Sequence, residues 1–183
     1  LILDSNPSLS VDEVKDLLYS SARDFGAAGW DKYFGHGIVD AKNAITGGDS
    51  FEIFEGELIA YTGTSKTVTI PSIVTKIGDW AFSFNNSIET VNIHDAVTDI
   101  GDYAFYDCDN LDNISIGNGV TSIGEWAFAD CDSIITISIP NSVTSIGASA
   151  FAFCWSLEDI NVGSTNTNYK SIDGVLFNKD GTT

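Results

Sequence analysis

Positive charge is scarce in this sequence. Its 183 residues include 26 Asp and Glu but only 8 Lys and Arg, which gives a formal net charge of -18. No lysine or arginine occurs between Lys76 and Lys170, a stretch that holds thirteen acidic residues. Such a surface repels a phosphate backbone, so nucleic acid is not expected as a partner. Surface acids mostly serve solubility, and cationic partners or divalent ions stay open as alternatives.

The sequence also lacks methionine, a signal peptide and an apolar run long enough to cross a membrane. It begins at Leu1 and ends at Gly181-Thr182-Thr183, and neither end has the features expected of a natural terminus. We therefore interpret the chain as a fragment and expect no membrane span in it. Its apolar fraction of 43% is typical of globular proteins, so a buried core is expected.

A period of 23 residues organises the sequence from residue 74 to residue 162. Val-Thr, Ile-Gly and Ala-Phe pairs each recur in four copies, and an apolar-x-x-apolar-x-apolar segment typical of a strand follows each Ala-Phe pair. The Ile-Gly pairs are Ile77-Gly78, Ile100-Gly101, Ile123-Gly124 and Ile146-Gly147. One repeat cannot cover its own apolar face, so we expect stacked repeats with aligned Ile, Val and Phe columns as the core.

Glycine and proline mark the turns of this repeat. The glycine after each repeat isoleucine predicts either a tight turn with positive φ or a close approach of two backbones. Pro71 and Pro140 predict strand ends, because proline has no N–H to donate to a strand ladder. Residues 51–73 are expected to cap the first repeat, and residues 163–183 to form an insertion and hairpin that open a further repeat.

The repeat resembles the BspA-like, or Treponema-type, leucine-rich repeat, whose pattern reads L-x-x-I-x-I-P-x-x-V-T-S-I-G-x-x-A-F-x-x-C. Residues 116–131 and 139–154 match it closely. The resemblance implies a solenoid with a long, repetitive surface for binding a protein or a surface polymer. The strand positions expected to point outward form a small polar surface without an aromatic row, although any solvated strand shows such residues. This strand face comprises Thr90, Asn92, Asn113, Ser115, Thr136, Ser138, Asp159 and Asn161.

The cysteines occupy one column of the repeat, at Cys108, Cys131 and Cys154, with a spacing that does not fit a zinc site. Side chains in register point in the same direction, so the thiols should not converge on disulfides, and we expect reduced, buried cysteines. His94 takes the slot of Pro71 and is expected on the surface at a strand exit, without a catalytic role. No metal site and no cofactor are predicted.

The segment before the repeats has a helical pattern. Ser10 and Glu13 form a capping box that predicts a helix through about Arg23. A second, short helix is expected from Ala41 to Ile45. So short a segment has too little apolar surface to fold alone, and it reads as the end of a larger domain.

Residues 1–46 resemble the C-terminal end of subtilisin-like serine peptidases, the S8 or subtilase family. SARDFGAAGWDKYFGHGIVDAKNAI is similar to the closing signature of that family, most specifically over residues 35–41. The resemblance implies a Ser-His-Asp triad upstream of Leu1 in a parent protein. None of the triad motifs occurs here, and His36 does not match the catalytic histidine. We predict no catalytic residue and no peptidase activity for this chain, and hydrolysis abolished by a serine-directed inhibitor would contradict this.

Together these observations predict an α+β fragment: a short helical tail of an α/β subtilisin-like domain, a linker at residues 47–50 and a β-rich solenoid. The first functional hypothesis is an exported bacterial serine endopeptidase, acting on protein substrates, with the repeats as a binding module. The alternatives are a cell-surface adhesion or ligand-binding repeat protein and a passive spacer. Both resemblances imply a secreted or cell-surface bacterial protein.

Overall fold

The computed structural model describes residues 22–23, 38–39 and 50–181. The chain divides into two compact units, residues 1–52 and residues 53–183, which are described separately. In the first unit, β1 (Ala22–Arg23) pairs with β2 (Ile38–Val39) in an antiparallel two-stranded sheet.

The predicted helical tail is wrong where the structure describes it. Ala22 and Arg23, expected at the end of a helix, form β1, because their backbones pair with Val39 and Ile38. At these two residues, pairing with a segment further along the chain overrides local helix propensity. Residues 10–21 of that helix and all of the predicted helix at residues 41–45 lie outside the described residues. The described residues contain no helix, so the predicted α+β class is corrected to a β-solenoid.

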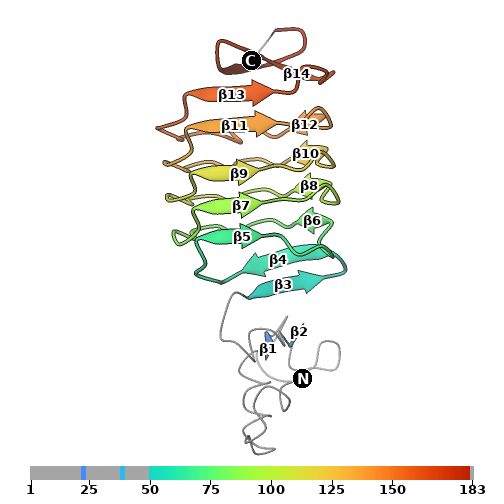
Figure 1. Cartoon of the computed structure of the whole chain (residues 1–183), viewed down its shortest axis with the longest axis vertical. Helices are drawn as coiled ribbons and strands as arrows, with labels where there is room; N and C mark the ends of the chain where they lie inside the picture. The colour runs from blue at the N-terminus through green and yellow to red at the C-terminus, as the bar shows by residue number, and fades with distance from the viewer. Residues whose placement is uncertain (1–21, 24–37, 40–49, 182–183) are drawn as a thin grey trace, which may run out of the picture. The chain divides into compact units, whose positions relative to one another are not determined.

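The second unit is a solenoid of stacked rungs, each of which contributes two short strands on different sides (Figure 1). One side is a six-stranded sheet, which consists in spatial order of β12 (Ser145–Ile146), β10 (Ser122–Ile123), β8 (Asp99–Ile100), β6 (Lys76–Ile77), β4 (Glu57–Tyr61) and β3 (Phe51–Phe54). The other side holds a three-stranded sheet of β5 (Thr67–Thr69), β7 (Thr90–Asn92) and β9 (Asn113–Ser115), followed by a two-stranded sheet of β11 (Thr136–Ile139) and β13 (Asp159–Val162).

Equivalent residues of successive rungs stack in register, which confirms the predicted solenoid. Ile100 pairs with Ile77 on one side and with Ile123 on the other. The aligned columns are buried, and the rings of Phe82, Phe105 and Phe128 form a continuous stack in the centre of the rungs. The core is therefore made of columns that run along the solenoid and not of one cluster per repeat.

The glycine after each repeat isoleucine is required by close backbone approach. The amide of Gly124 donates to the carbonyl of Ile100 at 2.8 Å. A Cβ on Gly124 would lie 2.5 Å from the carbonyl carbon of Gly101 in the preceding rung. Among the described glycines, φ is positive at Gly56, Gly174 and Gly181 and not in this column. Of the two explanations offered by the sequence, close approach is correct.

A hairpin covers the C-terminal end of the solenoid. It consists of β14 (Tyr169–Ile172) and β15 (Val175–Asn178), which pair antiparallel. The carbonyl of Gly174 accepts the amide of Ile160 in β13, and the hydroxyl of Tyr169 accepts the amide of Ile146 in β12, each at 2.8 Å. The hairpin thereby satisfies backbone groups that the last rung would otherwise expose at its edge.

Candidate functional site

The predicted strand face lies on β7, β9, β11 and β13, which follow one another on the same side of the solenoid (Figure 1). Register pairs bring its members together in two columns, for example Asn92 beside Ser115 and Ser138 beside Asn161. Six of the eight side chains are exposed, and those of Thr90 and Asn92 are half-buried. The outward direction expected from the strand pattern thus holds most clearly from β9 onward.

A shallow depression of about 540 Å³ opens in this face where β9 adjoins β11. Its lining includes Asn113, Ser115, Ser138 and Asn161 of the strand face. Among the described strands, no ladder joins β9 to β11, whereas the opposite side of the solenoid is one continuous sheet. The depression therefore marks a local gap between the third and fourth rungs.

Two glycines follow β9 beside this gap. A Cβ on Gly117 would lie 2.5 Å from the carbonyl carbon of His94, and one on Gly119 would overlap the carbonyl oxygen of Asp95. Only glycine permits so close an approach to the preceding backbone. The chain leaving β9 therefore lies close against the rung that contains β7.

His94 links two rungs. Its Nδ1 accepts the amide of Ala96 at 3.2 Å, and its Nε2 lies 3.0 Å from the carbonyl oxygen of Pro71. Because a carbonyl oxygen can only accept, the ring proton belongs on Nε2, and the imidazole is neutral in this arrangement. The side chain is half-buried at the strand exit, where it has a structural role.

The cysteine column is structural as well. Cys108 and Cys131 are buried, as predicted, whereas Cys154 is half-buried, and all three are free thiols. Each Sγ donates to the carbonyl oxygen of the repeat phenylalanine in the preceding rung, at 3.2, 3.0 and 3.0 Å. Burial raises the pKa of the Cys108 thiol to about 12 and raises the pKa values of Cys131 and Cys154 as well. These thiols are therefore poor nucleophiles.

The buried thiols predict a loss of stability at alkaline pH. In the unfolded chain they ionise near pH 9, whereas in the folded chain Cys108 stays protonated to about pH 12. The contribution of the thiols to the free energy of unfolding is therefore complete below pH 9. It is lost as the pH rises toward 12, because ionisation of the thiols favours the unfolded state. Thermal melts between pH 7 and 10.5 should show this decline, and a Cys108→Ala/Cys131→Ala variant should show less of it. Equal declines in both proteins would contradict the assignment.

A row of aromatic side chains follows the turn segments between the two strands of each rung, and the sequence analysis missed it. This aromatic row comprises Trp80, Phe84, Tyr103, Tyr106, Trp126, Phe153 and Trp155. The rings of Trp80 and Tyr103 stack with centroids 4.2 Å apart, and Tyr103 stacks on Trp126 at 6.1 Å. Each ring contacts another member, so the row is continuous over four rungs.

The signal for this row was present in the repeat alignment. Trp80, Tyr103 and Trp126 share one column, two residues after the repeat glycine. The sequence predicts outward positions only in strands, where side chains alternate between faces. The turn segments have no such period, so their outward positions need the structure.

The backbone of this column is left-handed, with φ of 61° at Trp80, 56° at Tyr103 and 54° at Trp126. In this conformation the amide of Tyr103 donates to the carbonyl of Glu125 in the next rung, at 2.9 Å. Ser149 holds the same column with φ 57°. Since a serine satisfies the same backbone, the turn itself does not require aromatic rings.

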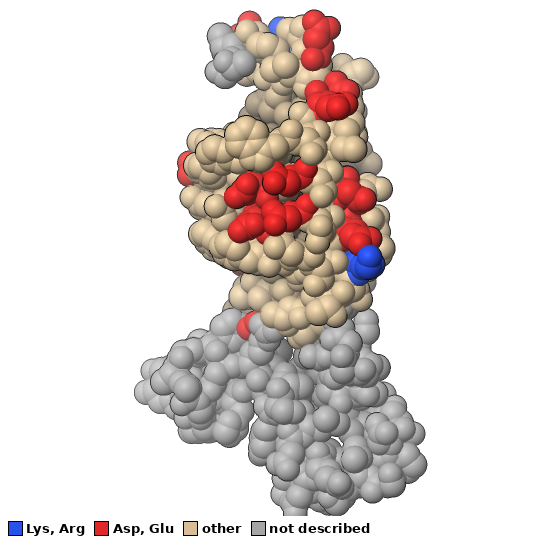
Figure 2. Space-filling model, turned by 90° about the vertical axis from the view of Figure 1, so that its left-hand side faces the viewer, with Lys and Arg blue, Asp and Glu red and all other residues tan. Residues whose placement is uncertain are grey.

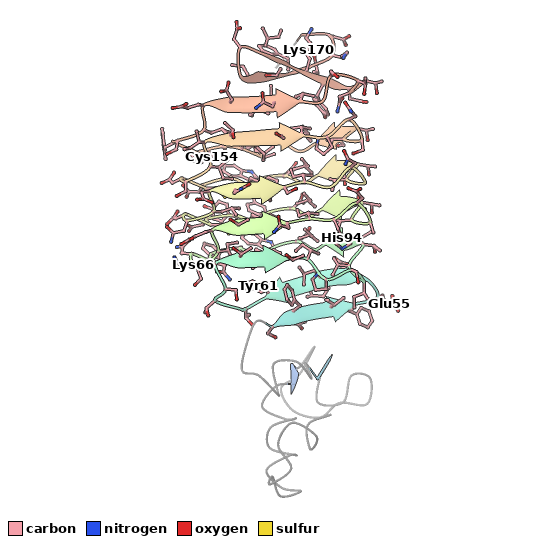
Figure 3. All side chains as sticks on the ribbon, in the orientation of Figure 1. Glu55, Tyr61, Lys66, His94, Cys154 and Lys170 are labelled. Carbon is pink, nitrogen blue, oxygen red and sulfur yellow. The ribbon has the colours of Figure 1, made fainter. Side chains whose placement is uncertain are left out.

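Four carboxylates adjoin the aromatic row, and we call them the acidic corner: Asp107, Asp109, Asp130 and Asp132. Partial burial and then the negative charges of Asp107 and Asp132 raise the pKa of Asp109. Figure 2 shows acidic side chains gathered on the side of the solenoid where Figure 3 places Cys154. No group of three His, Cys, Asp or Glu side chains that could hold a metal ion occurs in the part of the chain that the structure describes.

Comparison with known families identifies the repeat. The profile of the BspA type leucine rich repeat region matches residues 55–180 in six copies. A leucine rich cell surface protein from Faecalibacterium prausnitzii A2-165 is 33% identical with a TM-score of 0.57, over 61% of this chain and 30% of that chain. A leucine-rich repeat protein from Bacteroides capillosus ATCC 29799 is 31% identical with a TM-score of 0.56, over 65% of this chain and 96% of that chain. The pneumococcal vaccine antigen PcpA is 26% identical with a TM-score of 0.58, over 63% of this chain and 35% of that chain.

A curated relative is the Neisserial autotransporter lipoprotein NalP of Neisseria meningitidis serogroup B. It is 37% identical over 89 residues, which cover 48% of this chain and 7% of the relative. The match thus spans a small part of that protein. None of these matches shows the subtilisin-like domain end predicted for residues 1–46. Within the described residues, no helix has the length and apolar character needed to cross a membrane.

Proposed function

Because the chain belongs to the BspA type leucine-rich-repeat family, we propose that its solenoid is the binding module of a secreted or cell-surface protein. The profile covers residues 55–180, and leucine-rich repeats support a role in protein binding. The similar protein from Faecalibacterium prausnitzii is a cell surface protein, and NalP is an autotransporter lipoprotein. The peptidase hypothesis has no such support, and binding replaces it as the principal function.

The observation that carries this proposal is the depression in the strand face. Exposed amide and hydroxyl groups of Asn113, Ser115, Ser138 and Asn161 converge there. They line a wide, shallow surface that suits a segment of a macromolecule better than an enclosed small molecule. The edges of β9 and β11, which no ladder joins, add backbone donors and acceptors beneath it. We therefore place a protein partner on this part of the strand face.

An arginine at Ser138 tests the site. Ser138 lines the depression, whereas Thr69 is exposed in the equivalent column on β5 and does not line it. Immobilised matrix proteins, mucin and bacterial cell-wall material serve as a panel, with binding measured by interferometry. We expect one protein of the panel to bind the unaltered chain, Ser138→Arg to weaken it about ten-fold, and Thr69→Arg to leave it within about two-fold. A panel that retains nothing, or equal binding by both variants, would overturn the proposal.

A further inference from the structure

A second surface lies on the turn segments between the two strands of each rung, where the aromatic row meets the acidic corner. The same three-residue position of successive rungs reads Phe84-Asn85-Asn86, Asp107-Cys108-Asp109, Asp130-Cys131-Asp132 and Phe153-Cys154-Trp155. The two middle rungs thus present the four acids, and the rungs on either side present aromatic rings. We call the rings of Phe84, Phe153 and Trp155 the aromatic rim. Tyr106 and Trp126 extend it, since Tyr106 contacts Phe84 and Trp126 contacts Phe153.

The charge of this surface is not compensated by the repeats. They contribute no lysine or arginine between Lys76 and Lys170. The exposed ion pair between Lys66 and Glu89 lies at the start of the array and leaves the acidic corner untouched. The acids also repel one another: after burial, the negative charges of Asp107 and Asp132 raise the pKa of Asp109. A cationic group placed among them would relieve this repulsion.

The rings on either side are exposed to an unusual degree for such large apolar groups. Trp155 is 78% exposed, Phe84 59% and Phe153 54%. Contiguous apolar surface rimmed by polar groups marks sites of interaction. Phe84 and Phe153 also hold φ of 60°, a left-handed backbone that bulky side chains seldom adopt. Asp107 and Asp130 show that a short polar residue fits the same column, so folding does not demand these rings.

We propose that this surface docks a basic segment of a partner protein, an extended chain whose arginine or lysine side chains meet the acidic corner and whose stems lie on the aromatic rim. A guanidinium group pairs with a carboxylate through two parallel hydrogen bonds and also stacks on an aromatic face. A neutral polysaccharide would use the rings but gain nothing from four carboxylates, so the charge favours a basic protein segment. None of the residues of this surface lines the depression in the strand face, so the proposal is independent of that depression.

The test uses a fluorescent peptide of alternating arginine and serine, with a glutamine-serine peptide and a soluble neutral oligosaccharide as controls. At 0.15 M salt we expect the full chain to bind the arginine peptide and neither of the two controls. Asp107→Asn/Asp130→Asn keeps the shape of the corner and should weaken binding about ten-fold. Asp173→Asn/Asp180→Asn removes the same charge on the C-terminal hairpin and should weaken it less than about two-fold.

A ring variant separates docking from simple charge attraction. Trp155→Ser removes the most exposed ring and should weaken binding of the arginine peptide about three-fold, in line with an exposed cation–π contact. If Asp107→Asn/Asp130→Asn and Asp173→Asn/Asp180→Asn weaken binding of the arginine peptide equally, the attraction is not specific to the acidic corner and the proposal is overturned. Full binding by Trp155→Ser, or binding of the oligosaccharide in place of the peptide, would overturn it as well. Circular dichroism establishes that each variant retains the fold.

Discussion

Replacing Phe105 with alanine should lower the free energy of unfolding by about 4 kcal/mol, within the usual range for a buried phenylalanine. Phe105 is fully buried at the middle of the aromatic core stack. Its ring lies between those of Phe82 and Phe128, with centroid separations of 4.7 and 5.1 Å. The variant would lose ring contacts on both sides and leave a cavity, because the backbones above and below are held by hydrogen bonds between rungs.

Phe151→Ala is the matched control for this variant. Phe151 occupies the same column in the next rung after Phe128 but is half-buried and stacks on Phe128 alone, at 5.7 Å. Its replacement should lower the free energy of unfolding by less than half as much, since less apolar surface returns to water and the contact with only one stacked ring is lost. Urea denaturation of both variants measures the difference. Equal losses would mean that the central stack does not carry the stability of the array.

Adding a single methyl group at Gly124 should be nearly as damaging, with an expected loss of about 3 kcal/mol, at the upper end for overpacking. The new Cβ would lie 2.5 Å from the carbonyl carbon of Gly101 and 2.6 Å from the amide nitrogen of Asp102. Both contacts are with backbone, which cannot rotate away. The rungs would have to separate, and the hydrogen bond from the Gly124 amide to the Ile100 carbonyl would lengthen.

Glu125→Ala, one residue further on, provides the comparison. Glu125 is exposed and its backbone conformation suits alanine, so the change should alter stability by less than about 0.5 kcal/mol. Thermal and urea denaturation of the two variants should therefore differ widely. If Gly124→Ala proves as stable as Glu125→Ala, the close approach of the rungs is not what requires glycine at this position.

From β9 onward the side chains of the strand face are exposed as the strand pattern predicts, whereas those of Thr90 and Asn92 are half-buried. Alternation along a strand places Asn113 and Ser115 on the side opposite Ile114, so their exposure follows from the sequence. The depression beside them lies where no ladder joins β9 to β11. That interruption belongs to the packed array, and no local pattern contains it.

The error in the N-terminal segment has a similar origin. A capping box and an apolar period describe what a short stretch prefers when only its neighbours in sequence act on it. Ala22 and Arg23 instead pair with Val39 and Ile38, so a partner outside that stretch determines their conformation. Local propensity is a weak guide wherever such pairing is available.

The sequence by itself determined the solenoid, because equal repeats of 23 residues bring Val, Ile and Phe back to the same place in every rung. Only the tertiary structure decided which turn residues face solvent. In a strand the side chains alternate, but in the left-handed turns at Trp80, Phe84 and Tyr103 the direction of each side chain depends on hydrogen bonds to the neighbouring rung. The aromatic rim and the acidic corner become one surface through that stacking, since different rungs supply most of their residues.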